Sequence, residues 1–189
     1  RAVNKEFKDI DIFLNNFQQS LYQLQHAKFP VVSCPSGLAI GGGYEVISQT
    51  SFIAAHSNSV LGLVESLVGL IPAGGGCKEM LRRWANHSDI KNDPKKLSLK
   101  VFNLIGYATT ADSPIKAKAQ QFLGEQDIMV MSKDRLIEEA DKIIFFNKEN
   151  YSSLDSATFS LPGSTVMSDM MDILYAVSYT HLRAHETSI

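Results

Sequence analysis

Gly41-Gly42-Gly43-Tyr44-Glu45, which follows the apolar run Leu38-Ala39-Ile40, is the stretch of sequence that decides the fold. Glycine has no Cβ, so three glycines in a row let the backbone approach a ligand very closely. A helix that begins in this run leaves its first N–H groups free to hold a developing negative charge, and Glu45 lies one helical turn further on. A second carboxylate, Glu65, follows the apolar run Gly62-Leu63-Val64. Together the two segments predict an oxyanion site flanked by two carboxylates, which suits the addition or removal of water beside a carbonyl group.

Each part of this pattern also has a simpler interpretation. Three glycines before a helix are compatible with a tight turn, Glu45 with a solvated helix residue, and Glu65 with half of a structural ion pair. Two other glycine motifs fit poorly, because a dinucleotide fingerprint requires glycine where Val46 stands. A P-loop requires Gly-Lys-Ser/Thr, whereas residues 74–78 read Gly-Gly-Gly-Cys-Lys. The two glutamates taken together favour the catalytic interpretation.

Composition describes an ordinary globular chain. Of 189 residues, 44% are hydrophobic and 20% are charged, and the formal net charge is −2. This balance gives no basic surface for nucleic acid, and no stretch is long and apolar enough to span a bilayer. The two cysteines, Cys34 and Cys77, are too few for a disulfide framework, which favours a reducing, cytoplasmic compartment. Both are expected in the core, with a reactive thiol at Cys77 as the alternative, because a glycine turn that opens a helix precedes it.

Hydrophobic periodicity predicts alternating helices and strands, and therefore an α/β class. The amphipathic segment 6–28 predicts a helix that packs Phe7, Phe13 and Phe17 into the core. Polar residues and Pro94 predict a loop over 86–96. Further helices are expected over 42–49, from 76 to about 84, and over 97–105, 113–123 and 133–146. Strands are expected over 31–34, 52–55, 60–64 and 128–131.

In the predicted helix after Gly76, Lys78 and Glu79 are expected on the solvated face. Arg82 and Arg83 near its end suit the negative helix terminus and are expected at the surface.

From Phe29 to Met80 the sequence resembles the crotonase (enoyl-CoA hydratase/isomerase) superfamily. The order and spacing of four segments carry the resemblance: Phe29-Pro30-Val31-Val32, residues 36–45, Leu61-Gly62-Leu63-Val64-Glu65, and residues 68–76. Two of these segments are similar to those of one bacterial subgroup, in which a 3-hydroxyacyl-CoA dehydrogenase precedes a C-terminal crotonase domain. They read Gly-Leu-Val-Glu over 62–65 and Gly-Leu-Ile-Pro-Ala-Gly-Gly-Gly-Cys-Lys-Glu-Met over 69–80. The resemblance implies a crotonase-like ββα superhelix, truncated at its N-terminus and ending in helices.

For the site, the resemblance implies that the Gly42 N–H binds the thioester oxygen, and that Glu45 and Glu65 form the acid/base pair that activates water. Val64 stands where many hydratases have proline, and Ser51 where many have aspartate. The second departure puts a local helix-end contact in doubt. The implied activity is hydration of an enoyl-CoA thioester in fatty-acid β-oxidation, without a metal or a cofactor. NAD would serve the dehydrogenase of the full-length parent, which is expected to be a homo-oligomer.

Alternatives stay open beside this reading. An enoyl-CoA isomerase would need mainly Glu65, so the presence of Glu45 counts against it. A further alternative is that this chain is an inactive fragment that serves only fold or oligomer contacts. For Arg82 and Arg83, the alternative to a plain surface role is contact with the phosphates of CoA.

The sequence predicts three parts: a partial crotonase-like domain over 1–146, a tail with the start of a C-terminal helix over 147–176, and a segment over 177–189. The last segment resembles a translated sequencing-adaptor read-through and is expected to be non-native. His181 and His185 within it have the spacing of a helical zinc pair, but no metal site is expected there. Because the chain begins at Arg1, we expect an internal fragment of a longer protein.

Overall fold

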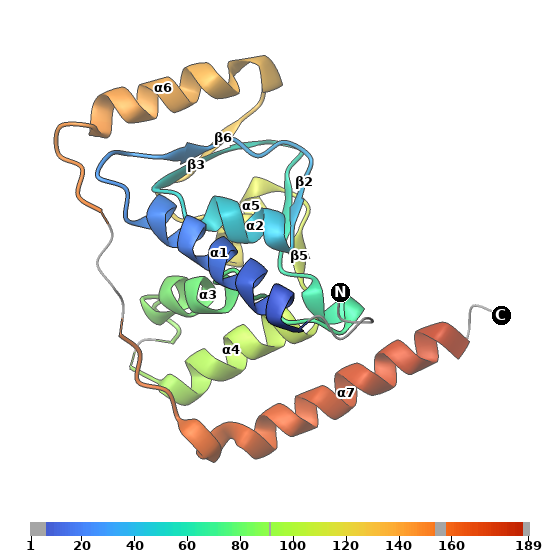
Figure 1. The fold of residues 1–189 in the computed structure, drawn as a ribbon. Helices are drawn as coiled ribbons and strands as arrows, with labels where there is room; N and C mark the ends of the chain where they lie inside the picture. The colour runs from blue at the N-terminus through green and yellow to red at the C-terminus, as the bar shows by residue number, and fades with distance from the viewer. Residues whose placement is uncertain (1–6, 91, 154–157, 187–189) are drawn as a thin grey trace.

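The chain is built from two successive strand–strand–helix repeats. A computed structural model describes residues 7–90, 92–153 and 158–186 (Figure 1). The first repeat comprises β1 (Val32–Ser33), β2 (Leu38–Ile40) and α2 (Gly42–Ser48). The second comprises β3 (Phe52–His56), β4 (Val60–Gly62) and α3 (Gly76–Ala85), with the 3-10 helix η1 (Glu65–Val68) between β4 and α3. This order confirms the α/β class and the expected ββα arrangement.

Within each repeat the two strands enter different sheets. Strand β3 lies between β1 and β6 (Ile128–Val130) and pairs in parallel with both. Strand β4 lies between β2, to which it is parallel, and β5 (Thr110–Ala111), to which it is antiparallel. Because the register aligns Ile40 with Gly62, the glycine run that follows β2 and the segment that follows β4 leave the sheet side by side.

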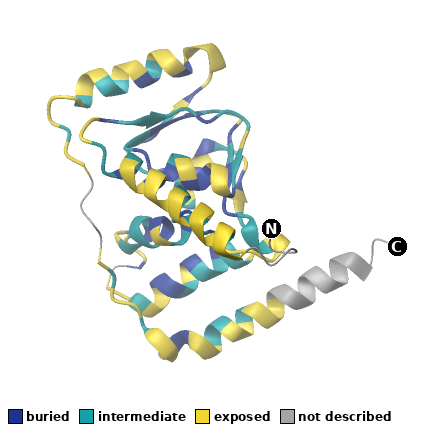
Figure 2. Ribbon diagram, in the orientation of Figure 1, coloured by how far each residue is buried: buried dark blue, intermediate teal, exposed yellow. Residues whose placement is uncertain are grey.

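Helices cover these sheets and enclose the core. Helix α6 (Leu136–Asn147) packs on β1 and β3, while α2 lies on the other side of that sheet (Figure 1). The main core joins α2, β3, β4, α3 and α4 (Pro94–Gly106), and Figure 2 shows the buried positions concentrated on these elements. At its centre the fully buried Tyr44 packs edge-to-face on Phe122 and donates to the Phe122 carbonyl oxygen at 3.1 Å.

Helix α1 (Phe7–Gln25) buries much less than its amphipathic pattern predicts. Only Leu21 and Gln25 are buried in it, and the half-buried Phe17 lies against Gly74. The expectation that Phe7 and Phe13 pack into the core was wrong, since their exposed fractions are 65% and 60%. Helical spacing shows that a helix has an apolar stripe, but the length of the stripe that is covered depends on what packs against it.

Three predicted boundaries differ from the structure for local reasons. Helix α4 begins at Pro94 rather than after the predicted loop, because Asp93 Oδ1 accepts a hydrogen bond from the Lys96 N–H at 2.9 Å and caps the helix. Helix α5 (Pro114–Ala119) ends earlier than predicted, where the Ala117 carbonyl accepts from the N–H groups of Phe122 and Leu123. The two-residue strand β5 was not predicted, because its length carries no periodicity.

The chain ends in a long helix that packs on α4. Helix α7 (Met167–Glu186) follows the 3-10 helix η3 (Gly163–Val166). Its backbone continues beyond Ala176 into the segment that is expected to be non-native. The side chains of residues 177–186 lie outside the described part of the structure. Among the described residues, no helix combines the length and the apolar character needed to cross a membrane.

Candidate active site

The loop before α3 encloses the carboxylate of Glu45. Glu45 lies on α2, and its side chain is buried. The backbone N–H groups of Gly74 and Gly76 both donate to Glu45 Oε1, each at an N···O distance of 2.8 Å. Hydrogen bonds to an ionised acceptor are stronger than those between neutral groups. Oε1 is therefore committed to the loop, while no described residue donates to Oε2.

The close approach of this loop requires glycine at two positions. A methyl group at Gly74 would overlap Phe17 Cε1 and lie 2.8 Å from Glu45 Oε2. A methyl group at Gly76 would lie 2.7 Å from Leu63 Cδ2 and 3.1 Å from Glu45 Oε1. The glycine run over 74–76 thus serves to bring backbone N–H groups to a side-chain carboxylate, whereas a P-loop brings them to phosphate groups.

Glu65 begins η1, separated from the end of β4 by Leu63 and Val64, and the environment of its carboxylate differs from that of Glu45. Both oxygens are buried, and neither accepts a hydrogen bond from a described residue. Burial raises the pKa of the Glu65 carboxyl group above its ordinary value. The negative charge of Glu45 raises this pKa further. The backbone N–H groups of Glu65 and Val64 lower it in part, although their geometry falls short of a hydrogen bond.

The predicted site residues come from neighbouring segments. The Gly41 N–H donates to the Gly62 carbonyl at 2.8 Å, which joins the glycine run to the end of β4. A methyl group at Gly41 would lie 3.4 Å from Glu65 Oε1, so Glu65 lies against the glycine run. Gly42 is exposed and is the first residue of α2, so its N–H has no acceptor within the helix. The two glutamates are near enough for the charge of Glu45 to affect the pKa of Glu65.

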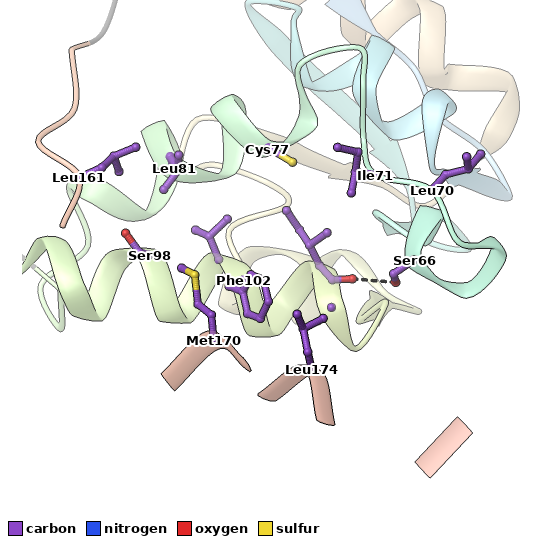
Figure 3. Close-up of a pocket in the computed structure, with 13 residues that line it drawn as sticks. Ser66, Leu70, Ile71, Cys77, Leu81, Ser98, Phe102, Leu161, Met170 and Leu174 are labelled. Carbon is purple, nitrogen blue, oxygen red and sulfur yellow. Dashed lines mark hydrogen bonds between the residues drawn. The ribbon is translucent and has the colours of Figure 1, made fainter. Parts of the chain in front are cut away.

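An apolar cavity of about 440 Å³ opens beside these segments (Figure 3). Side chains from η1, the following loop and helices α3, α4 and α7 line it, among them Leu70, Ile71, Leu81, Val101, Phe102 and Leu174. Its hydroxyl groups already have partners: Ser66 Oγ donates to the Ile105 carbonyl at 2.9 Å, and Ser98 Oγ to the Pro94 carbonyl at 2.8 Å. The cavity therefore suits an apolar ligand. Neither glutamate lines it.

Cys77 links the cavity to the two carboxylates. Its side chain lines the cavity, and burial raises the pKa of its thiol, to which the charges of Glu45 and Glu65 add. Each of these effects disfavours the thiolate, which is the reactive form of cysteine. This environment counts against the alternative that Cys77 is a reactive thiol.

Sequence reasoning missed a buried polar network around α3. Glu79 is fully buried, accepts from Gln25 Nε2 at 2.9 Å and pairs with Arg82. The side chain of Arg83 is nearly buried and lies 3.9 Å from Asp127 Oδ2. The expectations of a solvated Glu79 and a surface Arg83 were therefore wrong. The i, i+3 and i, i+4 spacing of Glu79 with the two arginines was the available signal.

Pairing with these carboxylates also counts against the alternative that Arg82 and Arg83 bind CoA phosphates. Among the side chains that the structure describes, no group of three His, Cys, Asp or Glu residues comes together to hold a metal ion. The side chains of His181 and His185 lie outside the described part.

Comparisons with known proteins agree with this geometry. A family model for enoyl-CoA hydratase/isomerase matches residues 1–92. The chain is 34% identical over 137 residues to the "Probable 3-hydroxyacyl-CoA dehydrogenase" of Bacillus subtilis, which covers 72% of the chain and 17% of that protein. It is 33% identical over 141 residues to the "Putative fatty acid oxidation complex trifunctional enzyme" of Rickettsia felis, which covers 72% of the chain and 18% of that protein.

The chain thus spans less than a fifth of the length of these two relatives. Among solved structures, an enoyl-CoA hydratase/isomerase from Cupriavidus metallidurans superposes with a TM-score of 0.61 at 13% identity. The superposition covers 93% of the chain and 61% of that structure, which supports the fold. With the ββα repeats and the two glutamates that follow β2 and β4, these matches show that the chain belongs to the enoyl-CoA hydratase/isomerase, or crotonase, family.

Proposed function

We propose that this chain carries the hydratase site of a fatty-acid β-oxidation protein, which adds water to a trans-2-enoyl-CoA to give a 3-hydroxyacyl-CoA. The observation that supports this most is the contrast between the two glutamates. Glu45 has one oxygen held by two N–H groups, whereas Glu65 accepts no well-formed hydrogen bond from the described residues and has a raised pKa. Two carboxylates whose environments differ in this way are suited to act as a base and an acid in one reaction.

In the proposed step, Glu45 Oε2 accepts a proton from water while the water oxygen forms a bond to Cβ of the enoyl group. The electron pair of the C=C bond shifts toward the thioester oxygen, which gives an enolate. That pair then forms the new bond between Cα and the proton that the protonated Glu65 delivers. The Gly42 N–H stabilises the negative charge on the thioester oxygen. Each well-placed acid or base contributes roughly 10²–10⁴-fold to such a reaction, and a backbone donor at the oxyanion about 3 kcal/mol.

The apolar cavity of η1, α3, α4 and α7 would hold the acyl chain, because its polar groups already have partners. A 3-hydroxyacyl-CoA dehydrogenase elsewhere in the parent would oxidise the product with NAD, as the names of the relatives suggest. The glycine run of this chain does not fit NAD, since Val46 stands where the dinucleotide motif needs its third glycine.

The test is hydration of crotonyl-CoA by the full-length parent and by its Glu45→Gln and Glu65→Gln variants. Each variant is expected to lose several orders of magnitude in kcat with a much smaller change in KM, while Glu149→Gln, at an exposed position, serves as the control. Double-bond migration that depends on Glu65, with hydration unaffected in Glu45→Gln, would instead establish the isomerase. An inactive parent would refute the hydratase, and an active parent with an inactive 189-residue chain would identify the latter as an incomplete fragment.

A further inference from the structure

The loop that holds Glu45 is itself held from outside by α1. We call Pro72–Gly76 the carboxylate loop, because the N–H groups of Gly74 and Gly76 bind Glu45 Oε1. Phe17 and Leu21 of α1 pack directly on Gly74, where an added methyl group would overlap Phe17 and lie 3.0 Å from Leu21 Cδ1. A displacement of α1 would therefore be transmitted to the backbone that orients Glu45.

One polar contact joins α1 to the first half of this loop. Gln18 Nε2 donates to the Ala73 carbonyl at 2.7 Å, across 55 residues of sequence. Ala73 shares a peptide bond with Gly74, so this hydrogen bond acts on the peptide unit whose N–H reaches Glu45. The Gln18 side chain is exposed and contributes little to the core, which leaves the orientation of this peptide as its main structural effect.

A second contact fixes the end of the loop. The buried Gln25 of α1 donates to Glu79 Oε2 at 2.9 Å and accepts from Lys78 Nζ at 2.7 Å. Glu79 and Lys78 lie in the first turn of α3, immediately after the carboxylate loop. Helix α1 therefore forms hydrogen bonds with the chain both within the carboxylate loop and just after it.

We propose that Gln18 is a positioning residue for the hydration step, acting through the Ala73–Gly74 peptide on the Glu45 carboxylate; the proposal rests on the hydratase function proposed above. Gln18 is not proposed to contact the substrate. Its effect follows from geometry, because a reacting group displaced by about 1 Å can lose roughly 100-fold in rate. Loss of one hydrogen bond to an exposed side chain, in contrast, should leave the stability of the fold almost unchanged.

The test compares three variants of the intact parent protein. Gln18→Met keeps the length of the side chain and removes the donor, Gln18→Lys restores a donor, and Gln19→Met is the matched control at the next exposed position of α1. We expect Gln18→Met to lower kcat for crotonyl-CoA by about 10–100-fold with KM within twofold and an unchanged Tm. Gln18→Lys should recover most of the loss, and Gln19→Met should match the wild type.

A second measurement tests the hydrogen bond between Gln18 and Ala73 independently of catalysis. Amide hydrogen exchange at Gly74 and Gly76 should accelerate about tenfold in Gln18→Met and remain unchanged in Gln19→Met. Unchanged exchange would overturn the proposal whatever the activity. So would faster exchange with an unchanged kcat, or a loss that appears in KM or Tm in place of kcat. If wild-type hydration is absent, or survives in Glu45→Gln, the proposed function fails as well, and exchange shows whether the contact itself exists.

Discussion

Replacing Glu45 by alanine or by glutamine should affect stability very differently. Glu45→Ala leaves the buried N–H groups of Gly74 and Gly76 without an acceptor. An unsatisfied buried donor costs about 1–3 kcal/mol, so the pair should cost roughly 2–6 kcal/mol of unfolding free energy. Glu45→Gln keeps an oxygen at Oε1 for both donors and nearly the same volume, so its cost should be only about 1–2 kcal/mol.

Urea unfolding can be followed through the single tryptophan, Trp84, which is buried in α3. The midpoint should fall far more in Glu45→Ala than in Glu45→Gln, with an unchanged dependence on urea in both. Glu149→Ala, at an exposed position after α6, is the control and should leave the midpoint in place. Equal losses in the two Glu45 variants, or no loss in Glu45→Ala, would refute the view that this carboxylate organises the loop.

Three further results are expected. The raised pKa of Glu65 means that its ionised form destabilises the fold; Glu65→Gln should therefore raise the unfolding midpoint at pH 8, and this advantage should vanish as the pH falls below the ordinary carboxyl value of 4.5. A midpoint difference that grows toward low pH would contradict this sign. Gly62→Ala would place a methyl group 2.7 Å from the Thr109 carbonyl oxygen, so calorimetry should show about 1–3 kcal/mol of destabilisation. Arg83→Met should cost about 3–5 kcal/mol in denaturant unfolding, because it leaves the buried Asp127 carboxylate without its cation; a cost near zero would show that the pair is dispensable.

The sequence was most informative where local chemistry and tertiary packing agree. The glycine run and the two glutamates predicted α2, β4 and a site between them, because each feature depends on a few adjacent residues. The partner of Glu45 could not be predicted in the same way. Gly74 and Gly76 reach it across about 30 residues of sequence, through a register that only the assembled sheet defines.

The charged residues of α3 show the same limit of prediction from sequence. Glu79 and the two arginines have the composition of a solvated helix face, and propensity alone places them outside. Glu79 and Arg83 are buried because α1 supplies an amide from Gln25 and β6 follows directly on Asp127, whereas Arg82 stays partly exposed. These partners form hydrogen bonds or ion pairs with the buried polar groups, and the local sequence of α3 does not predict them. The exposed aromatic residues of α1 are the converse case, since periodicity cannot say how far a helix is covered.

The central position of β3 has a consequence for the order in which the chain folds. Its partner β1 lies shortly before it, but its other neighbour, β6, is separated from it by most of the remaining domain: Asp127, which binds the Ile53 N–H at 2.8 Å, follows it by 74 residues. At about 5–20 residues per second, a ribosome needs roughly 4–15 s to supply that partner. During this interval the parallel edge of β3 is open, and closure of so long a loop makes this pairing a slow event. Co-translational association with other unpaired strands therefore competes with native folding at β3.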